Sequence, residues 1–291
     1  MYWEKPWFQF AILILLAFTW GSSFILMKIG LKSFSNEQAA ALRIIFASLV
    51  LLPYSIKNLK YLKLKDLKSI LMVGFIGSFI TAFLFMKAQT RIDSAMAGML
   101  NSLTPVFTLL VGMLFYRMLF AWKQIVGLSL GLIGALGLIT FGEDVSIGNI
   151  NSYAFLIVLA SVFYAVSVNE VKARLTHLTG MQITALTFFF IGPVALVYLF
   201  ATDLDPIFQQ PDWQIHFAAL ALLGIVGTAF ALVMMNSLIR RVSPIYAASV
   251  TYIIPVFAIF WGVMDGEQIS FFHLLFMTVI MAGVYIINRK K

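Results

Sequence analysis

An arginine stands inside a strongly apolar stretch of this sequence, where a charged side chain is unexpected. Arg43 has Ala39, Ala40 and Ala47 on the same helical face. A charge near the centre of a bilayer costs about 2.5–3.5 kcal/mol on insertion scales, so something should compensate it. Its planar guanidinium is suited to bind a substrate carboxylate or phosphate. The alternative is structural: the side chain extends to the lipid interface or donates to freed carbonyls. The sequence favours neither.

Aromatic and polar side chains supply further candidates for a binding site. Trp20 and Ser23 recur at helical spacing in the first apolar stretch, and a buried indole N–H needs a hydrogen-bond partner. Aromatic residues of later stretches could line the same space, although at helical spacing they more often pack in a core. The candidate substrate-binding residues are Trp20, Ser23, Arg43, Phe79, Phe83, Asn101, Tyr164, Tyr246, Thr251 and Tyr252.

Two apolar stretches are interrupted by a proline that is followed by Val-Phe. They read SLTPVFTLLVG around Pro105 and YIIPVFAIFWG around Pro255. A proline inside a helix has no N–H to donate, so Pro105 frees the carbonyl of Asn101 and Pro255 frees that of Thr251. In hydrocarbon, a freed carbonyl is tolerated only where it faces other protein or a water-filled cavity. We therefore predict hinges at Pro105 and Pro255 beside a cavity; a kink that only improves packing is the alternative.

These residues must be positioned by helices that cross a membrane. The 291 residues are 62% hydrophobic and only 11% charged, whereas soluble domains carry about 25% charged residues. The apolar residues form blocks of roughly 20, the length with which a helix crosses about 30 Å of hydrocarbon. The blocks start near Phe8, Glu37, Leu67, Asp93, Phe120, Tyr153, Met181, Trp213, Ser243 and Ile269. We expect an all-α integral membrane protein with ten transmembrane helices.

Basic residues gather in every second connection between these helices. If the N-terminus is cytoplasmic, 15 of the 20 Lys and Arg lie on the cytoplasmic side, while the opposite loops collect acidic residues. Because basic loops resist translocation, we expect a multi-pass protein of the plasma membrane with both termini cytoplasmic. The same distribution accounts for the net charge of +8. We therefore expect the lipid bilayer, and no nucleic acid, as a partner.

The two halves of the chain repeat each other. Residues 74–112 match residues 224–262 without a gap, and the identical pairs include Gly77 with Gly227 and Pro105 with Pro255. Each copy, 1–145 and 146–291, holds five expected helices. Because five is odd, the second copy must enter the membrane upside down. Inverted repeats place a shared cavity near the bilayer midplane, and their two halves can open it alternately to either side.

Other kinds of chemistry lack support in the residues. The chain has no cysteine, so a disulfide or a thiolate metal site is not available. Its three histidines, at 177, 216 and 273, fall at loops or helix ends and not at metal-ligand spacing. The sequence has no P-loop for ATP hydrolysis, and an intramembrane enzyme would need a cluster of His, Asp or Cys at one side. We expect no metal, no cofactor and no enzymatic activity.

Several of these features together resemble a known family, the EamA-type transporters of the drug/metabolite transporter superfamily. The residues that carry the resemblance are Trp20-Gly21-Ser22-Ser23-Phe24, Lys28, Arg43, the two Pro-Val-Phe segments and Gly266-Glu267. It covers nearly the whole chain as two tandem five-helix units. Two positions depart from the family pattern: Arg117 stands where an acid matching Glu267 is usual, and Tyr164 stands where tryptophan is common.

The resemblance implies a secondary transporter, usually in a bacterial inner membrane, with its fifth and tenth helices peripheral. The implied substrates are small metabolites, amino acids or related compounds, often moved outward. A multidrug or lipid-linked substrate is one alternative, and a membrane sensor or scaffold that transports nothing is another. Proton coupling usually needs a carboxylate deep in the membrane. The only acid in apolar sequence is Glu170, close to the cytoplasmic edge, so facilitated diffusion and exchange stay open, as does a homodimer.

Overall fold

The computed structural model describes residues 4–118, 122–141 and 152–288, and in these ranges it contains helices and no strand. Nine helical stretches of the described residues are long and apolar enough to cross a membrane. They are Pro6–Gly30, Asn36–Tyr61, Leu64–Ala88, Ser94–Tyr116, Trp122–Phe141, Ser152–Arg174, Gly180–Phe200, Trp213–Ile239 and Pro244–Met264. A shorter apolar stretch, Phe271–Gly283, follows them. The expectation of an all-helical membrane protein is confirmed.

Six helices are continuous: α1 (Pro6–Gly30), α2 (Asn36–Asn58), α7 (Trp122–Phe141), α8 (Ser152–Arg174), α9 (Gly180–Phe200) and α15 (Phe271–Asn288). Two of them begin with the same capping box. The Ser35 hydroxyl accepts from the backbone N–H of Gln38, whose side chain accepts from the N–H of Ser35. Thr179 and Gln182 repeat this exchange at the start of α9. Each box satisfies N–H groups that a helix end leaves free.

Two spans change to π-helix near their middle. The first consists of α3 (Leu64–Gly74), the π-helical segment Phe75–Ile80 and α4 (Thr81–Ala88). The second consists of α11 (Trp213–Gly224), the π-helical segment Ile225–Phe230 and α12 (Ala231–Ile239). A π-helical turn leaves a carbonyl without its usual donor. Threonine hydroxyls supply the donor here: Thr81 to Ile76 O at 2.8 Å and Thr228 to Leu223 O at 3.0 Å.

Two further spans are broken beside the prolines at which we predicted hinges, Pro105 and Pro255. α5 (Ser94–Asn101) ends just before α6 (Thr104–Tyr116). α13 (Pro244–Ala248) is joined to α14 (Ile254–Met264) by a 3₁₀ turn, Ser249–Tyr252. Pro105 and Pro255 lie in the first turn of α6 and α14, where the missing N–H costs least. The carbonyl of Asn101, expected to be freed, accepts a hydrogen bond from the Thr104 hydroxyl at 2.7 Å.

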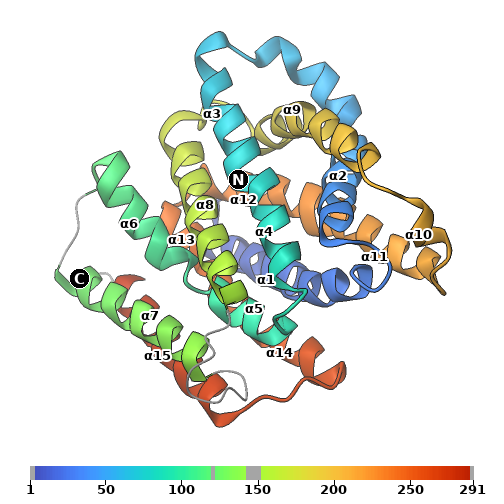
Figure 1. The fold of residues 1–291 in the computed structure, drawn as a ribbon. Coiled ribbons are helices and arrows are strands. Elements are labelled where there is room, and N and C mark those ends of the chain that lie inside the picture. Colours follow the sequence, from blue (N-terminus) through green and yellow to red (C-terminus); the bar gives the residue numbers. More distant parts are fainter. Residues whose placement is uncertain (1–3, 119–121, 142–151, 289–291) are drawn as a thin grey trace.

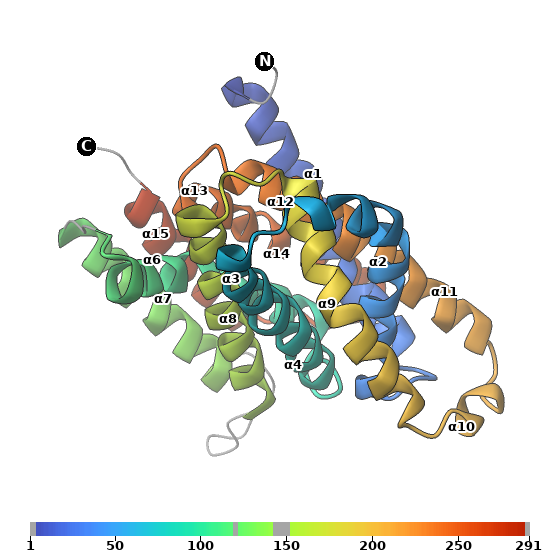
Figure 2. The ribbon, with the colours of Figure 1, turned by 90° about the horizontal axis from the view of Figure 1, so that it is seen from above.

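Most of the helices pack around a common centre, and two of them, α7 and α15, lie outside it. α7 and α15 lie side by side at one edge of the bundle (Figures 1 and 2), and α2 packs along α9. Glycines allow two of the central contacts. A methyl group at Gly77 would overlap Ser167 of α8, and one at Gly227 would lie 2.8 Å from the hydroxyl of Ser23 on α1. A short helix, α10 (Asp205–Phe208), connects α9 to α11.

Charged clusters mark the two ends of the bundle. At one end, Lys28 forms ion pairs with Asp265 at 2.7 Å and with Glu267 at 2.9 Å. At the other, Glu170 accepts from the hydroxyls of Ser69 and Tyr116 and lies 3.5 Å from Arg174. We call these the Lys28 end and the Glu170 end. The span from α3 to α4 runs from the second to the first, where Gln89 donates to Phe24 O.

Candidate functional site: a cavity between the two halves

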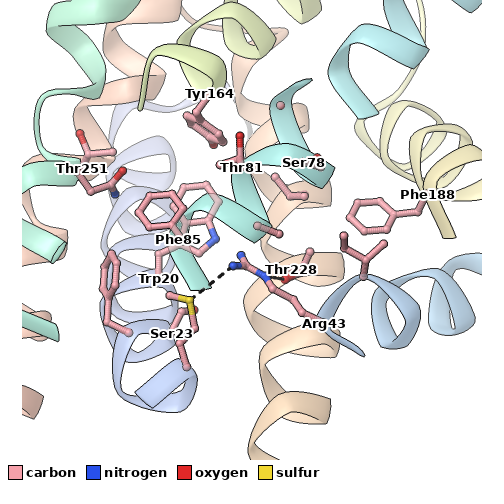
Figure 3. Close-up of a pocket in the computed structure, with 17 residues that line it drawn as sticks. Trp20, Ser23, Arg43, Ser78, Thr81, Phe85, Tyr164, Phe188, Thr228 and Thr251 are labelled. Atoms are coloured by element: carbon pink, nitrogen blue, oxygen red, sulfur yellow. Dashed lines mark hydrogen bonds between the residues drawn. The ribbon is translucent and has the colours of Figure 1, made fainter. Parts of the chain in front are cut away.

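A cavity lies among α1, α2, α8, α9 and the broken spans (Figure 3). Its volume available to the centres of water molecules is about 90 Å³, whereas one water needs only about 10–15 Å³. The cavity therefore has room for a small organic molecule. Its polar lining residues are Ser23, Arg43, Ser78, Thr81, Asn101, Tyr164, Thr228 and Thr251. Its aromatic and larger apolar ones are Trp20, Phe24, Met27, Ile44, Phe85, Phe188 and Leu232.

Arg43 is the one charged side chain among the described residues that line this cavity. Its Nε donates to the hydroxyl of Thr228 at 2.7 Å, and one terminal nitrogen lies 3.9 Å from the sulfur of Met27 (Figure 3). In the part of the chain that the structure describes, no carboxylate lies within 4.0 Å of the guanidinium. The guanidinium has five N–H donors, and neutral contacts use only part of them. It can therefore bind an anion.

Thr228 belongs to the π-helical segment Ile225–Phe230, and this local irregularity positions the arginine. Its hydroxyl donates to Leu223 O, which leaves the oxygen lone pairs directed at Arg43. A regular helix would satisfy Leu223 O with a backbone N–H. Because of the π-helical turn, the Thr228 hydroxyl can bond both to its own backbone and to Arg43, and so it joins α2 to the second half of the chain. π-Helical turns are frequent at functional sites for this kind of reason.

Trp20 of α1 and Tyr164 of α8 meet at the wall of the cavity. Their rings form an edge-to-face pair with centroids 5.9 Å apart. The indole N–H of Trp20 donates to Gly227 O at 3.0 Å, in the same π-helical segment that holds Thr228. The hydroxyl of Tyr164 is buried and has no hydrogen-bond partner among the described residues. Trp20 is thus held by a backbone carbonyl, whereas the buried hydroxyl of Tyr164 has no partner among the described residues.

The structure brings six of the ten predicted substrate-binding residues together on this cavity: Trp20, Ser23, Arg43, Asn101, Tyr164 and Thr251. The remaining four are not among its lining residues. Phe79 stacks on Phe83, and Phe83 contacts Tyr198 of α9 edge to face. Tyr246 lies in the first turn of α13, where its N–H donates to Ser243, and Tyr252 ends the 3₁₀ turn. A role in substrate binding stays a prediction for all ten.

Sequence reasoning missed several lining residues. Thr228 stands out because it contacts Arg43 directly, and Ser78, Thr81, Phe85 and Phe188 also line the cavity. A signal for Thr228 was present in the repeat: Gly227-Thr228 matches Gly77-Ser78. A small residue followed by a hydroxyl residue, in the middle of two equivalent spans, could have indicated a special backbone. Phe188 carries no such mark, because its place depends on how α9 packs.

Glu170 lies outside the cavity lining. Its carboxylate is buried at the Glu170 end and is held by hydroxyls as well as by Arg174. The ion pair between Glu170 and Arg174, at 3.5 Å, is one part of this larger cluster. In the described residues, no group of three or more acidic or histidine side chains could hold a metal ion. Glu170 thus acts as a structural acceptor in this cluster.

One short stretch of the sequence has the letters of a serine nucleophile motif. Residues 127–131 read Gly-Leu-Ser-Leu-Gly, which is the letter pattern of a nucleophile elbow. That motif works only at a sharp turn between a strand and a helix. Here the five residues lie inside the continuous helix α7, and Gly131 packs against Val106. The backbone geometry that would expose a serine nucleophile is not formed.

The fold and the cavity together define a multi-pass membrane protein with a central cavity. The sequence pattern of the EamA-like transporter family matches residues 7–140 and again residues 151–289, and the chain belongs to this family. The match confirms the resemblance and points to a transporter rather than an enzyme. α7 and α15 contribute no residue to the cavity, in agreement with the peripheral helices that the resemblance implied.

Several relatives are similar over most of their length. The uncharacterized inner membrane transporter YedA of Escherichia coli K12 is 28% identical, covering 97% of this chain and 91% of its own. A probable terminal-alkyne amino-acid exporter of Streptantibioticus cattleyicolor is 24% identical over 96% and 92% of the two chains. An S-adenosylmethionine/S-adenosylhomocysteine transporter of Chlamydia trachomatis is 23% identical over 91% and 84%.

A solved crystal structure shares the fold of this chain. The two superpose with a TM-score of 0.68 at 15% sequence identity, over 98% of this chain and 97% of the other. At this identity the likeness concerns the fold alone. It shows that the helical arrangement described above occurs in an experimental structure over the same length.

Proposed function

We propose that this chain is a secondary transporter for small metabolites that carry a carboxylate, amino acids or related compounds foremost. The observation that carries this proposal is the guanidinium of Arg43, which faces the cavity with Thr228 as its closest polar partner and no carboxylate beside it among the described residues. A cation kept without a counter-ion in a partly apolar cavity is costly unless a ligand supplies the anion. A substrate carboxylate does so with the two parallel hydrogen bonds that a guanidinium favours.

The transport mechanism that we propose is alternating access by two inverted five-helix repeats, 1–145 and 146–291, ten helices in all. The backbone irregularities support it. The π-helical segments begin at 75 and 225, and the helix-breaking prolines stand at 105 and 255, both 150 positions apart. Each broken span has lost part of its hydrogen-bond ladder, so it can bend at low cost. Pro105 and Pro255 are the proposed hinges.

We place the protein in a bacterial inner membrane with both termini cytoplasmic, so that the Lys28 end faces outward. The distribution of basic residues supports this orientation. We propose export as the direction of transport. Of the two relatives above whose names give a substrate, one is named as an amino-acid exporter and the other as a transporter without a direction. Since no carboxylate lines the cavity in the described residues, exchange or facilitated diffusion fits the site better than proton coupling. A homodimer stays an untested expectation.

The cavity volume distinguishes this proposal from the alternatives. A volume of about 90 Å³ is small for a multidrug or lipid-linked substrate, because drug-sized ligands occupy pockets of about 300–1,000 Å³. A sensor or scaffold has no need of two equivalent helix breaks beside a charged cavity. These alternatives therefore rank below a metabolite transporter.

Counterflow in liposomes tests the proposal. Purified protein is reconstituted with an unlabelled amino acid inside, and uptake of the labelled amino acid is followed across a panel of amino acids. We expect exchange for at least one of them, a loss of at least about tenfold for Arg43→Gln, and partial retention for Arg43→Lys, since one charged hydrogen bond contributes about 1.5–3 kcal/mol. Thermal unfolding confirms that the variants are folded. Undiminished exchange by a folded Arg43→Gln protein would contradict the proposed site.

A further inference from the structure

A second, smaller pocket opens beside the cavity, on the side of the Glu170 end. The two share Gly77, Ser78, Tyr164, Phe188 and Leu232 as lining residues. The volume of the second pocket is about 10 Å³, which is room for one group of the size of a water molecule. Its polar lining residues are Ser78, Tyr164, Ser167, Thr184, Thr187 and Asn236. All are uncharged, and no charged residue is among the described residues that line it.

Two hydroxyl groups of this small pocket have no hydrogen-bond partner in the described part of the chain. They belong to Tyr164 and to Thr187, whose side chain is only 2% exposed. The neighbouring Thr184 provides a contrast, because its hydroxyl donates to Gly180 O and accepts from Asn236 at 3.0 Å. Buried hydroxyls in proteins are almost always hydrogen-bonded. Two hydroxyls without a protein partner, on residues that line one water-sized space, leave hydrogen-bonding capacity there for a small polar group.

The internal repeat shows that the free tyrosine hydroxyl is a particular feature of this side. Tyr164 stands 144 positions after Trp20, the same interval that separates the Ser35 and Thr179 capping boxes. Trp20 uses its N–H to bind Gly227 O of one π-helical segment. Tyr164 lies by the other π-helical segment, where Gly77 packs on Ser167, yet its hydroxyl binds nothing among the described residues. Trp20 therefore uses its N–H within the protein, whereas the hydroxyl of Tyr164 stays available to a ligand.

We propose that this small pocket binds the ammonium group of the substrate whose carboxylate binds Arg43, so that the site selects amino acids over simple carboxylic acids. The inference rests on the proposed function. An ammonium group has three donors and about the size of a water molecule, and the hydroxyl and amide oxygens of the pocket accept hydrogen bonds. The rings of Trp20 and Tyr164, at the junction of the two pockets, favour a cation by their π-electrons.

The charge distribution sets the orientation of such a zwitterion. Arg43 is the only charged residue among the described residues that line either space, so it attracts the carboxylate and repels the ammonium group. Figure 3 shows Tyr164 and Arg43 at separate places on the cavity, with Thr81 and Ser78 between them in that view. The apolar substituent of the substrate then lies against Phe24, Phe85 and related residues of the larger cavity.

Substrate pairs that differ only in the amino group test this inference. The probes are L-leucine with 4-methylpentanoate and L-phenylalanine with 3-phenylpropanoate, chosen for the aromatic wall of the cavity. Competition against counterflow, and protection against thermal unfolding, are measured for the full-length protein and for Tyr164→Phe and Thr187→Val. Ser161→Ala is the matched control, because it also removes a buried hydroxyl from α8, but one that bonds to Ile157 O and lines neither space.

We expect the unaltered protein to prefer each amino acid over its partner at least about tenfold, the effect of one lost charged hydrogen bond. Tyr164→Phe and Thr187→Val should bring the ratio close to one by weakening the amino acid alone, and Ser161→Ala should keep the ratio. A preference ratio near one in the unaltered protein would overturn the inference, and so would variants that weaken both members of a pair equally. A preference that vanishes when sodium is replaced by choline would also overturn it, because the small pocket would then hold a sodium ion and not the ammonium group. Exchange of the deaminated acids without preference would leave the proposed function intact, whereas a folded protein that binds neither member of either pair contradicts both.

Discussion

The ammonium nitrogen of Lys28 lies 2.9 Å from Oε1 of Glu267, so the end of α1 is joined to the segment that precedes α15. The same carboxylate accepts from the backbone N–H groups of Ser94 and Ala95 at 3.0 and 2.9 Å. These N–H groups open α5, where the helix dipole favours a negative charge. Glu267 therefore connects three separate parts of the Lys28 end, and its side chain is 2% exposed.

Glu267→Gln should lower stability more than Asp265→Asn does. The glutamine side chain would keep the shape but lose the charge that Lys28 and the α5 N-terminus require, a cost of about 2–3 kcal/mol for a buried charge-assisted network. Asp265 binds the same lysine at 2.7 Å but is 32% exposed, so its loss should cost less than about 1 kcal/mol. Thermal unfolding in detergent measures both. Equal losses would show that Glu267 acts only as one more surface partner of Lys28.

Thr228→Val should impair transport more than Thr81→Val. Both hydroxyls bond to a carbonyl five residues earlier in a π-helical span, and both line the cavity. Only Thr228 also accepts from Arg43. We expect its loss to slow counterflow about tenfold beyond the effect of Thr81→Val, because one charge-assisted bond then no longer orients the guanidinium. Similar rates for the two variants would mean that Arg43 keeps its position without Thr228.

Gly77→Ala should destabilise the protein, and Ser167→Gly should restore it. An added methyl group at Gly77 meets both Cβ and Oγ of Ser167, so α8 and the π-helical segment must move apart. Overpacking of this kind costs about 1–3 kcal/mol. Removal of the serine side chain in the double variant makes room again. The unfolding temperatures of the two single variants and the double variant test whether Ser167→Gly compensates Gly77→Ala. Additive losses of stability would show that the two residues are not in contact.

Asp93 should make stability depend on pH at the Lys28 end. Partial burial, and next the charge of Glu267, raise the pKa of the Asp93 carboxyl; Asp265 acts in the same direction, and Lys28 and His273 oppose it. A raised pKa in the folded state means that ionised Asp93 destabilises the fold at neutral pH, and that this penalty disappears as pH falls through the raised value. Asp93→Asn should therefore unfold at a higher temperature than the unaltered protein at pH 7, with a difference that narrows as the solution is acidified. A difference that stays constant or widens would contradict this.

Features that follow from local chemistry were predictable from the sequence. The helix breaks fall beside Pro105 and Pro255, which lack an N–H for the helix ladder, although α2 and α9 continue through Pro53 and Pro193. Trp20 bonds to a backbone carbonyl, as a buried indole should, whereas for Arg43, which lines the cavity, the sequence had left a binding and a structural role equally open. For Trp20, the chemistry of a single residue type is enough to explain the local feature.

Features that depend on the packing of distant segments were not predictable. The π-helical segments require one extra residue per turn, which no residue type at 75–80 or 225–230 demands. Thr228 meets Arg43 across 185 residues of sequence only because of that turn. Phe79 and Phe83 have the same aromatic character as Phe85, yet only Phe85 lines the cavity. Phe83 instead contacts Tyr198 of α9, a neighbour that its own sequence position does not reveal.

Alternating access by this fold requires that the two halves cross the membrane in opposite directions. Asp93 and Ser243, 150 positions apart, precede equivalent helices, α5 and α13. Because the chain has no cysteine, single Asp93→Cys and Ser243→Cys variants can be labelled in whole cells by a thiol reagent that does not cross membranes. We predict labelling of the cysteine at 93 in intact cells and of the cysteine at 243 only after the membrane is opened. Labelling of both from the same side would contradict the inverted repeat, and alternating access by this fold with it.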